Sequence, residues 1–200
     1  MKNSPLQRLR SLALTSGIFH TREARAAGVD ASRVWKLWKL GALERVSRGV
    51  YRLADAVATP NHSLALACGV VPHGVICLLS ALRFHDLGTQ SPAEVWMAVA
   101  RTAWRPRPTY PIIRYCYYGE QARDWGVEVH ALEGVQVKVY SVARTVADCF
   151  KFRNKIGLDV ALEALRECLR ARRCPVDDLW KAAGVCRVQR VMRPYLEAMP

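Results

Sequence analysis

The apolar positions of the first 55 residues follow a helical period three times and then alternate as in strands. Leu6, Leu9 and Leu12 recur at a spacing that places them on one face of a helix. The predicted elements are helices over residues 5–14, 21–28 and 32–40 and a β-hairpin over residues 43–53, with the turn at residues 47–49. Helix, helix, short turn, helix and hairpin is the chain order of a winged helix-turn-helix.

The ends of the second and third predicted helices carry stop and cap signals. Gly28 and Gly41 follow the last periodic residues, where glycine commonly ends a helix. Thr21 and Ser32 precede the first periodic residues and are expected to cap the second and third helices.

The remainder of the chain predicts a second domain of mixed structure. Residues 56–62 contain Pro60, lack periodicity and are expected to form a linker. Helical apolar runs are expected between residues 63 and 88. Strands are expected over 94–100 and 112–118, followed by two strands over 127–141 that are joined at Glu133–Gly134, and by four helices between residues 142 and 199. The predicted fold class is α+β, with an N-terminal winged helix-turn-helix at 1–55 and, at 63–200, a small, mostly antiparallel sheet flanked by helices.

Positive charge is concentrated at the N-terminus. The chain has 30 Lys and Arg against 17 Asp and Glu, a formal net charge of +13. Residues 1–55 hold 11 cations and 4 anions, whereas the longer remainder holds 19 and 13. This excess indicates a polyanionic partner, and its position favours duplex DNA.

The third predicted helix and the hairpin therefore supply the candidate contacts. The N-terminal part of a recognition helix meets base edges, while wing cations meet phosphates. The predicted DNA-binding residues are Ser32, Arg33, Trp35, Lys36 and Lys39 on the helix, and Arg45, Arg48 and Arg52 on the hairpin. Trp35 has an alternative role, since an aromatic beside Val34 could widen the core contact.

A second basic stretch surrounds a proline-rich loop in the predicted second domain. No Asp or Glu occurs from residue 95 to 119. The cations of this stretch are Arg101, Arg105, Arg107 and Arg114. They are expected to add phosphate contacts or to form a partner-binding edge.

Other classes of site have weaker support. Seven scattered cysteines without a C-x-x-C pair suggest reduced core thiols of a cytoplasmic protein, and no metal site or cofactor is expected. The chain contains no run of 18 apolar residues, so no membrane span is predicted. The N-terminus is more typical of a short amphipathic helix than of a signal peptide. A nuclease needs carboxylates and a lysine at set spacing, which Asp124 with Glu128 and Glu133 with Lys138 do not provide.

Several segments together resemble the AbiEi antitoxin family. They are RGVYRL, CLLSALRFHDL, SPAEVWMAV, VKVYSVARTVADCFKFRNKIGLDVALEALR and MRPYLEA. The resemblance covers nearly the whole chain. It implies a transcriptional regulator of a type IV toxin–antitoxin (abortive infection) system, whose winged helix binds repeats in its own promoter and whose C-terminal domain serves repression and toxin neutralisation. It also implies a nucleotidyltransferase-like toxin as functional partner, without a stable complex.

The expected function is thus a non-enzymatic, cytoplasmic DNA-binding repressor with antitoxin activity. The absence of a long dimerisation helix favours a monomer that binds DNA cooperatively. The alternatives are a protein- or RNA-interaction module that modulates a toxin and, more weakly, a nuclease.

Overall fold

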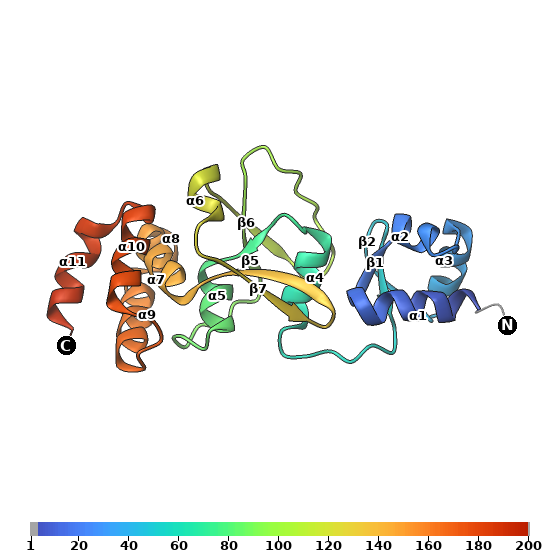
Figure 1. The fold of residues 1–200 in the computed structure, drawn as a ribbon, viewed down its shortest axis with the longest axis horizontal. Helices are drawn as coiled ribbons and strands as arrows, with labels where there is room; N and C mark the ends of the chain where they lie inside the picture. The colour runs from blue at the N-terminus through green and yellow to red at the C-terminus, as the bar shows by residue number, and fades with distance from the viewer. Residues whose placement is uncertain (1–3, 200) are drawn as a thin grey trace. The chain divides into compact units, whose positions relative to one another are not determined.

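The structure, a computed structural model, describes residues 4–199 (Figure 1) and divides into two compact units. The first unit takes the chain up to residue 73 together with residues 105–113 and 129–137. The second unit takes the remaining residues. The compact units are therefore assembled from separated stretches, whereas the predicted domains were continuous in sequence.

The N-terminal part of the first unit combines three helices with a three-stranded sheet. We call residues 4–55 the N-terminal module. Its elements are α1 (Pro5–Ser16), β1 (Ile18–His20), α2 (Thr21–Ala26), α3 (Ala31–Lys39), β2 (Leu43–Ser47) and β3 (Val50–Leu53). Leu9, Phe19, Val29, Val34 and Leu43 form its core and are almost completely buried.

The strand β1 was not predicted from the sequence. It pairs antiparallel with β3, with Phe19 opposite Tyr51, and the sheet order is β1-β3-β2. Three residues are too few to show an alternating pattern. As a consequence β3 is the central strand, and all four of its residues are buried.

The N-cap of the third helix lies two positions earlier than predicted, since it is Asp30 and not Ser32. The Asp30 carboxylate accepts hydrogen bonds from the Arg33 N–H at 2.9 Å and from the Ser32 hydroxyl at 2.6 Å. These hydrogen bonds lower the pKa of Asp30, and the bond from the Ser32 hydroxyl makes the largest contribution.

The predicted stop of this helix at Gly41 is confirmed. Gly41 has φ +75°, which glycine adopts without the strain of a Cβ. Its N–H donates to the Trp38 carbonyl, and the Ala42 N–H donates to the Leu37 carbonyl. This is a Schellman motif, which satisfies carbonyls at the end of the helix and turns the chain into β2.

The helix α4 (His62–Val70) and the tip of a second hairpin complete the first unit. Residues 64–70 are all buried, so α4 is covered on every side. Gly69 packs directly against Ile18. A Cβ at position 69 would lie 1.4 Å from Ile18 Cδ1, so a larger residue does not fit there. At the hairpin tip Glu133 accepts hydrogen bonds from the N–H and the hydroxyl of Thr59 at 2.7 and 2.8 Å.

The remaining elements make a five-stranded sheet and a set of helices (Figure 1). The strands are β4 (Val75–Ile76), β5 (Val95–Val99), β6 (Ile113–Tyr117), β7 (Val127–Leu132) and β8 (Val135–Tyr140), in the order β6-β5-β4-β8-β7. The helices are α5 (Leu78–Phe84), α6 (Glu120–Asp124), α7 (Val142–Lys151), α8 (Arg153–Ile156), α9 (Leu158–Arg170), α10 (Val176–Cys186) and α11 (Gln189–Ala198). The predicted α+β class is confirmed.

The sheet is mixed in direction. The strand β4 pairs antiparallel with β5 and parallel with β8, with Ile76 opposite Val139. The two residues of β4 lie in an apolar stretch that the sequence pattern assigned to a helix. The predicted turn at Glu133–Gly134 is confirmed, and both residues have positive φ, as a tight two-residue hairpin turn requires.

A buried ion pair lies in the core of the second unit. Arg144 and Asp148, on successive turns of α7, are both fully buried, and Arg144 Nε lies 3.0 Å from Asp148 Oδ2. Asp148 also accepts hydrogen bonds from the Tyr118 hydroxyl and the Cys186 thiol. The i, i+4 spacing of these two residues on α7 thus produces an ion pair inside the core.

Six of the seven cysteines are buried, and Cys174 is partly exposed. No helix within residues 4–199 has the length and apolar character needed to cross a membrane.

Candidate nucleic-acid interface

The outer face of α3 carries the cations predicted for DNA contact. Val34 is buried against the core, and Leu37 and Trp38 pack beside it. The opposite face is exposed and consists of Ser32, Arg33, Trp35, Lys36 and Lys39. Trp35 is 52% exposed, so its alternative role as a core residue is wrong.

One aromatic ring joins α3 to the hairpin. The Lys39 Nζ lies 4.7 Å from the centre of the Trp38 ring, and the Arg45 Cζ lies 5.5 Å from the same centre. Lys39 also lies 5.7 Å from the Trp35 ring. Cations over tryptophan faces are attracted by the ring quadrupole. The helix and β2 therefore present their cations on one continuous surface.

The hairpin is short, and its turn is fixed to the start of α2. The N–H and the hydroxyl of Thr21 both donate to the Gly49 carbonyl, at 2.9 and 3.2 Å. Arg48 is exposed in this turn, but the hairpin does not project as a free flap. Arg22 and Arg25, exposed on α2, are further cations of the module that were not singled out from the sequence.

Arg52 was predicted to contact phosphate, and its position argues against that role. Its side chain is buried in the central strand and donates to the carbonyls of Leu53 and Ala56 at 3.2 and 2.7 Å. It also contacts the ring of His62. The alternating pattern predicted that Arg52 lies on the outer face of a two-stranded hairpin. In the structure β3 also pairs with β1, and the segment after β3 covers the Arg52 side chain.

Two of the helix residues are already engaged. The Ser32 hydroxyl is bonded to Asp30, and Arg33 Nε lies 3.6 Å from the same carboxylate. Arg33 is thus partly neutralised in the free protein. Lys36 and Lys39 are exposed, form no ion pair within residues 4–199, and remain the strongest candidates of the set.

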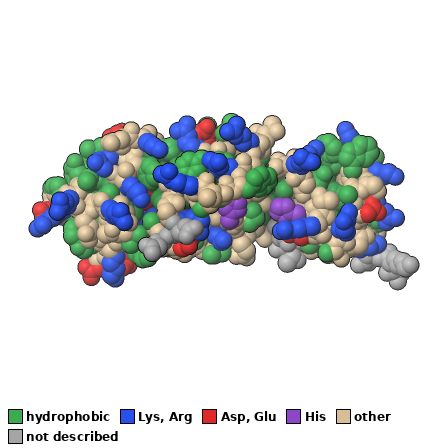
Figure 2. Space-filling view, turned by 90° about the horizontal axis from the view of Figure 1, so that it is seen from above, with side chains coloured by type: hydrophobic (Ala, Val, Ile, Leu, Met, Phe, Trp, Pro, Cys, Tyr) green, Lys and Arg blue, Asp and Glu red, His purple; other side chains and the backbone are tan. Residues whose placement is uncertain are grey.

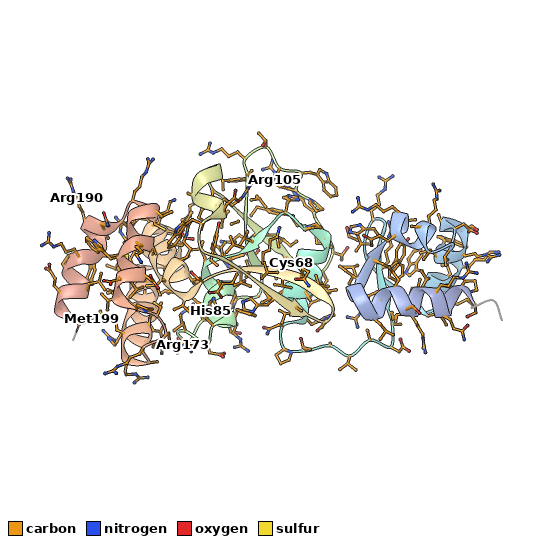
Figure 3. All side chains as sticks on the ribbon, viewed as in Figure 1. Cys68, His85, Arg105, Arg173, Arg190 and Met199 are labelled. Carbon is orange, nitrogen blue, oxygen red and sulfur yellow. The ribbon has the colours of Figure 1, made fainter. Side chains whose placement is uncertain are left out.

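The second basic stretch lies between β5 and β6, where Figure 3 labels Arg105. Arg101, Arg105 and Arg107 are exposed in this loop. Arg114 differs, because its Nε lies 2.6 Å from Glu94 and its guanidinium lies over the Trp96 ring. Glu94 lies one residue before the stretch 95–119 that contains no Asp or Glu. Arg114 therefore has a counter-charge, which was not expected from the sequence.

Positive side chains also occur outside this interface. Figure 2 shows many Lys and Arg side chains and few Asp and Glu on the face seen there.

Within residues 4–199 no group of three or more His, Cys, Asp or Glu side chains is arranged to hold a metal ion.

Comparisons with known proteins give a family for the N-terminal segment and a fold for most of the chain. The crystal structure of the RV2827C protein from Mycobacterium tuberculosis is similar, with a TM-score of 0.57 and 10% sequence identity, over 92% of this chain and 72% of that one. At this identity the likeness concerns the fold alone. No curated protein matches the sequence. Residues 7–54, the stretch that contains the candidate interface, match the family described as "Transcriptional regulator, AbiEi antitoxin", which is the family that the sequence resembles.

Proposed function

We propose that the protein is a DNA-binding transcriptional repressor and antitoxin, and that residues 1–55 act as a winged helix-turn-helix. In this proposal residues 56–62 are the linker and residues 63–200 the antitoxin domain. The match of residues 7–54 to AbiEi antitoxin transcriptional regulators supports a regulatory antitoxin role. The observation that carries DNA binding is the position of Lys39 and Arg45 over Trp38.

The dimensions of α3 agree with insertion into the major groove. A helix with its side chains is about 10–12 Å across, and the major groove of B-DNA is about 12 Å wide. With α3 in the groove, its exposed face meets base edges, through Ser32, Arg33, Trp35, Lys36 and Lys39. Arg45 and Arg48 then lie beside the neighbouring phosphates, as wing cations do. The proposed targets are repeats in the protein's own promoter, bound cooperatively by monomers in the cytoplasm.

The antitoxin activity is proposed from the family alone. Its functional partner would be a nucleotidyltransferase-like toxin encoded by the neighbouring gene, countered without a stable complex. Co-expression of the chain with that toxin should restore growth, while the two proteins should elute separately in size-exclusion chromatography.

A gel-shift titration tests DNA binding directly. The wild-type chain should bind the upstream intergenic DNA more tightly than a shuffled duplex of equal length at moderate salt. Lys36→Ala combined with Lys39→Ala should weaken specific binding by at least tenfold, because each base contact is worth about 1–3 kcal/mol.

A matched variant controls for the loss of two charges. Arg170 and Arg190 are exposed on α9 and α11, and Figure 3 labels Arg190. Arg170→Ala combined with Arg190→Ala removes the same charge and should leave specific binding within about twofold of wild type, since neither residue belongs to the proposed contact set. If the Lys36 and Lys39 double variant folds and still binds as wild type does, α3 is not the recognition helix.

A further inference from the structure

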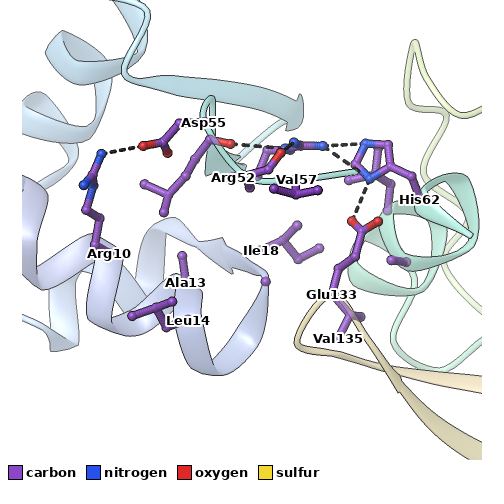
Figure 4. A pocket seen from close by; sticks show the side chains of 15 residues that line it. Arg10, Ala13, Leu14, Ile18, Arg52, Asp55, Val57, His62, Glu133 and Val135 are labelled. Carbon is purple, nitrogen blue, oxygen red and sulfur yellow. Dashed lines mark hydrogen bonds and ion pairs between the residues drawn. The ribbon is translucent and has the colours of Figure 1, made fainter. Parts of the chain in front are cut away.

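A cavity of about 460 Å³ lies within the first unit, beside the N-terminal module (Figure 4). Its walls come from α1, β1, β3, the segment after β3, α4 and the turn between β7 and β8. All of its lining residues belong to the first unit. The volume is within the range of about 300–1,000 Å³ that is typical of small-molecule sites.

The walls of the cavity are mainly apolar. Ala13 and Leu14 of α1 face it together with Ile18, Leu53 and Val57. Leu14 and Val57 are 83% and 85% exposed, so most of their apolar surface is in contact with water. Covering this surface with an apolar molecule would be favourable, because it removes the surface from water.

Each charged group that lines the cavity already has a partner. Arg10 and Asp55 form an ion pair at 2.5 Å, and His62 Nδ1 lies 2.7 Å from Glu133 Oε2 (Figure 4). Arg52 donates to backbone carbonyls. A charged ligand would have to break one of these pairs to find a partner, whereas an uncharged ligand would not.

We propose that this cavity binds an uncharged, predominantly apolar small molecule. Such a molecule would contact α1 and β3 on one side and α4 on the other, and so would stabilise the first unit. This inference does not depend on DNA binding, since none of the exposed residues of α3 lines the cavity.

The neutral fluorescent probe N-phenyl-1-naphthylamine tests the proposal on the full chain. The wild-type protein should give a saturable fluorescence increase with one probe per chain, and the probe should raise the midpoint of thermal unfolding. Leu14→Asn combined with Val57→Asn should weaken binding by about tenfold or more, because both changes replace apolar wall with polar amide.

The control is Leu40→Asn. Leu40 is 80% exposed but does not line the cavity, so this variant should bind the probe as wild type does. The proposal is overturned if binding does not saturate, if the double variant binds as well as wild type, or if Leu40→Asn loses as much. The anionic probe 8-anilino-1-naphthalenesulfonate should bind more weakly than the neutral probe, and tighter binding would refute the uncharged class of ligand.

Discussion

The guanidinium carbon of Arg45 lies 5.5 Å from the centre of the Trp38 ring, so a cation of β2 is held against an aromatic of α3. This cation–ring contact links the hairpin to the helix. The charged face of the N-terminal module therefore depends on packing as well as on charge, and the contributions of its arginines can be separated by experiment.

The hairpin arginines should differ in their effect on the salt dependence of DNA binding. Arg45→Ala combined with Arg48→Ala should reduce the slope of log K against log salt concentration by about 1.8, since each phosphate contact contributes about 0.9. Arg52→Met should leave the slope unchanged and lower the free energy of unfolding, because the Arg52 side chain is buried. Equal slopes for the Arg45/Arg48 variant and wild type would show that the hairpin does not touch DNA.

The loop between β5 and β6 gives a second test by the same measurement. Arg101, Arg105 and Arg107 are exposed there, whereas Arg114 is paired with Glu94. Replacing the first three with Ala should lower the salt slope, whereas Arg114→Ala alone should have a smaller effect because its charge is already neutralised. An unchanged slope in the triple variant would show that the loop takes no part in DNA binding.

Local signals in the sequence were sufficient for most elements but not for their tertiary neighbours. Gly41 and the Glu133–Gly134 turn were correctly predicted, because helix stops and tight turns depend on backbone conformations that a few residue types favour. Asp30 was missed as a cap because Ser32 is an equally good capping residue in sequence. The burial of Arg52 follows from its neighbours β1 and residues 56–62, which are set by tertiary packing that no local pattern contains.

The buried pair in α7 should be strongly coupled. Asp148→Ala would leave the Arg144 guanidinium buried without its counter-charge and should cost about 3–5 kcal/mol of stability. Arg144→Met combined with Asp148→Leu should cost less than Asp148→Ala alone, because no uncompensated charge remains. Urea unfolding of wild type and these two variants measures the difference, and a double variant that is destabilised as much as Asp148→Ala, or more, would contradict the expectation.

Glu133 should make stability fall at acidic pH. Burial raises the pKa of Glu133, but hydrogen bonds from Thr59 and His62 outweigh it and hold the pKa below its ordinary value of 4.5. A carboxylate with a lowered pKa stabilises the fold above its unfolded pKa, and this contribution is lost as the pH falls through the folded pKa. The loss of stability between pH 6 and pH 3 should therefore be smaller in Glu133→Gln than in wild type, as measured by urea midpoints.

A comparison of Gly17→Ala with Gly41→Ala distinguishes the cost of backbone strain from the cost of steric overlap. Both glycines directly follow helices. Gly17 and Gly41 have φ of +64° and +75°, a range that L side chains rarely adopt, so alanine is strained at either position. A Cβ at Gly41 meets nothing within 4 Å, whereas a Cβ at Gly17 would lie 1.7 Å from the carbonyl oxygen of Glu133. Gly17→Ala should therefore destabilise the protein clearly more than Gly41→Ala, because backbone must move as well. Equal unfolding free energies for the two variants would mean that Gly17 does not pack against the hairpin tip in solution.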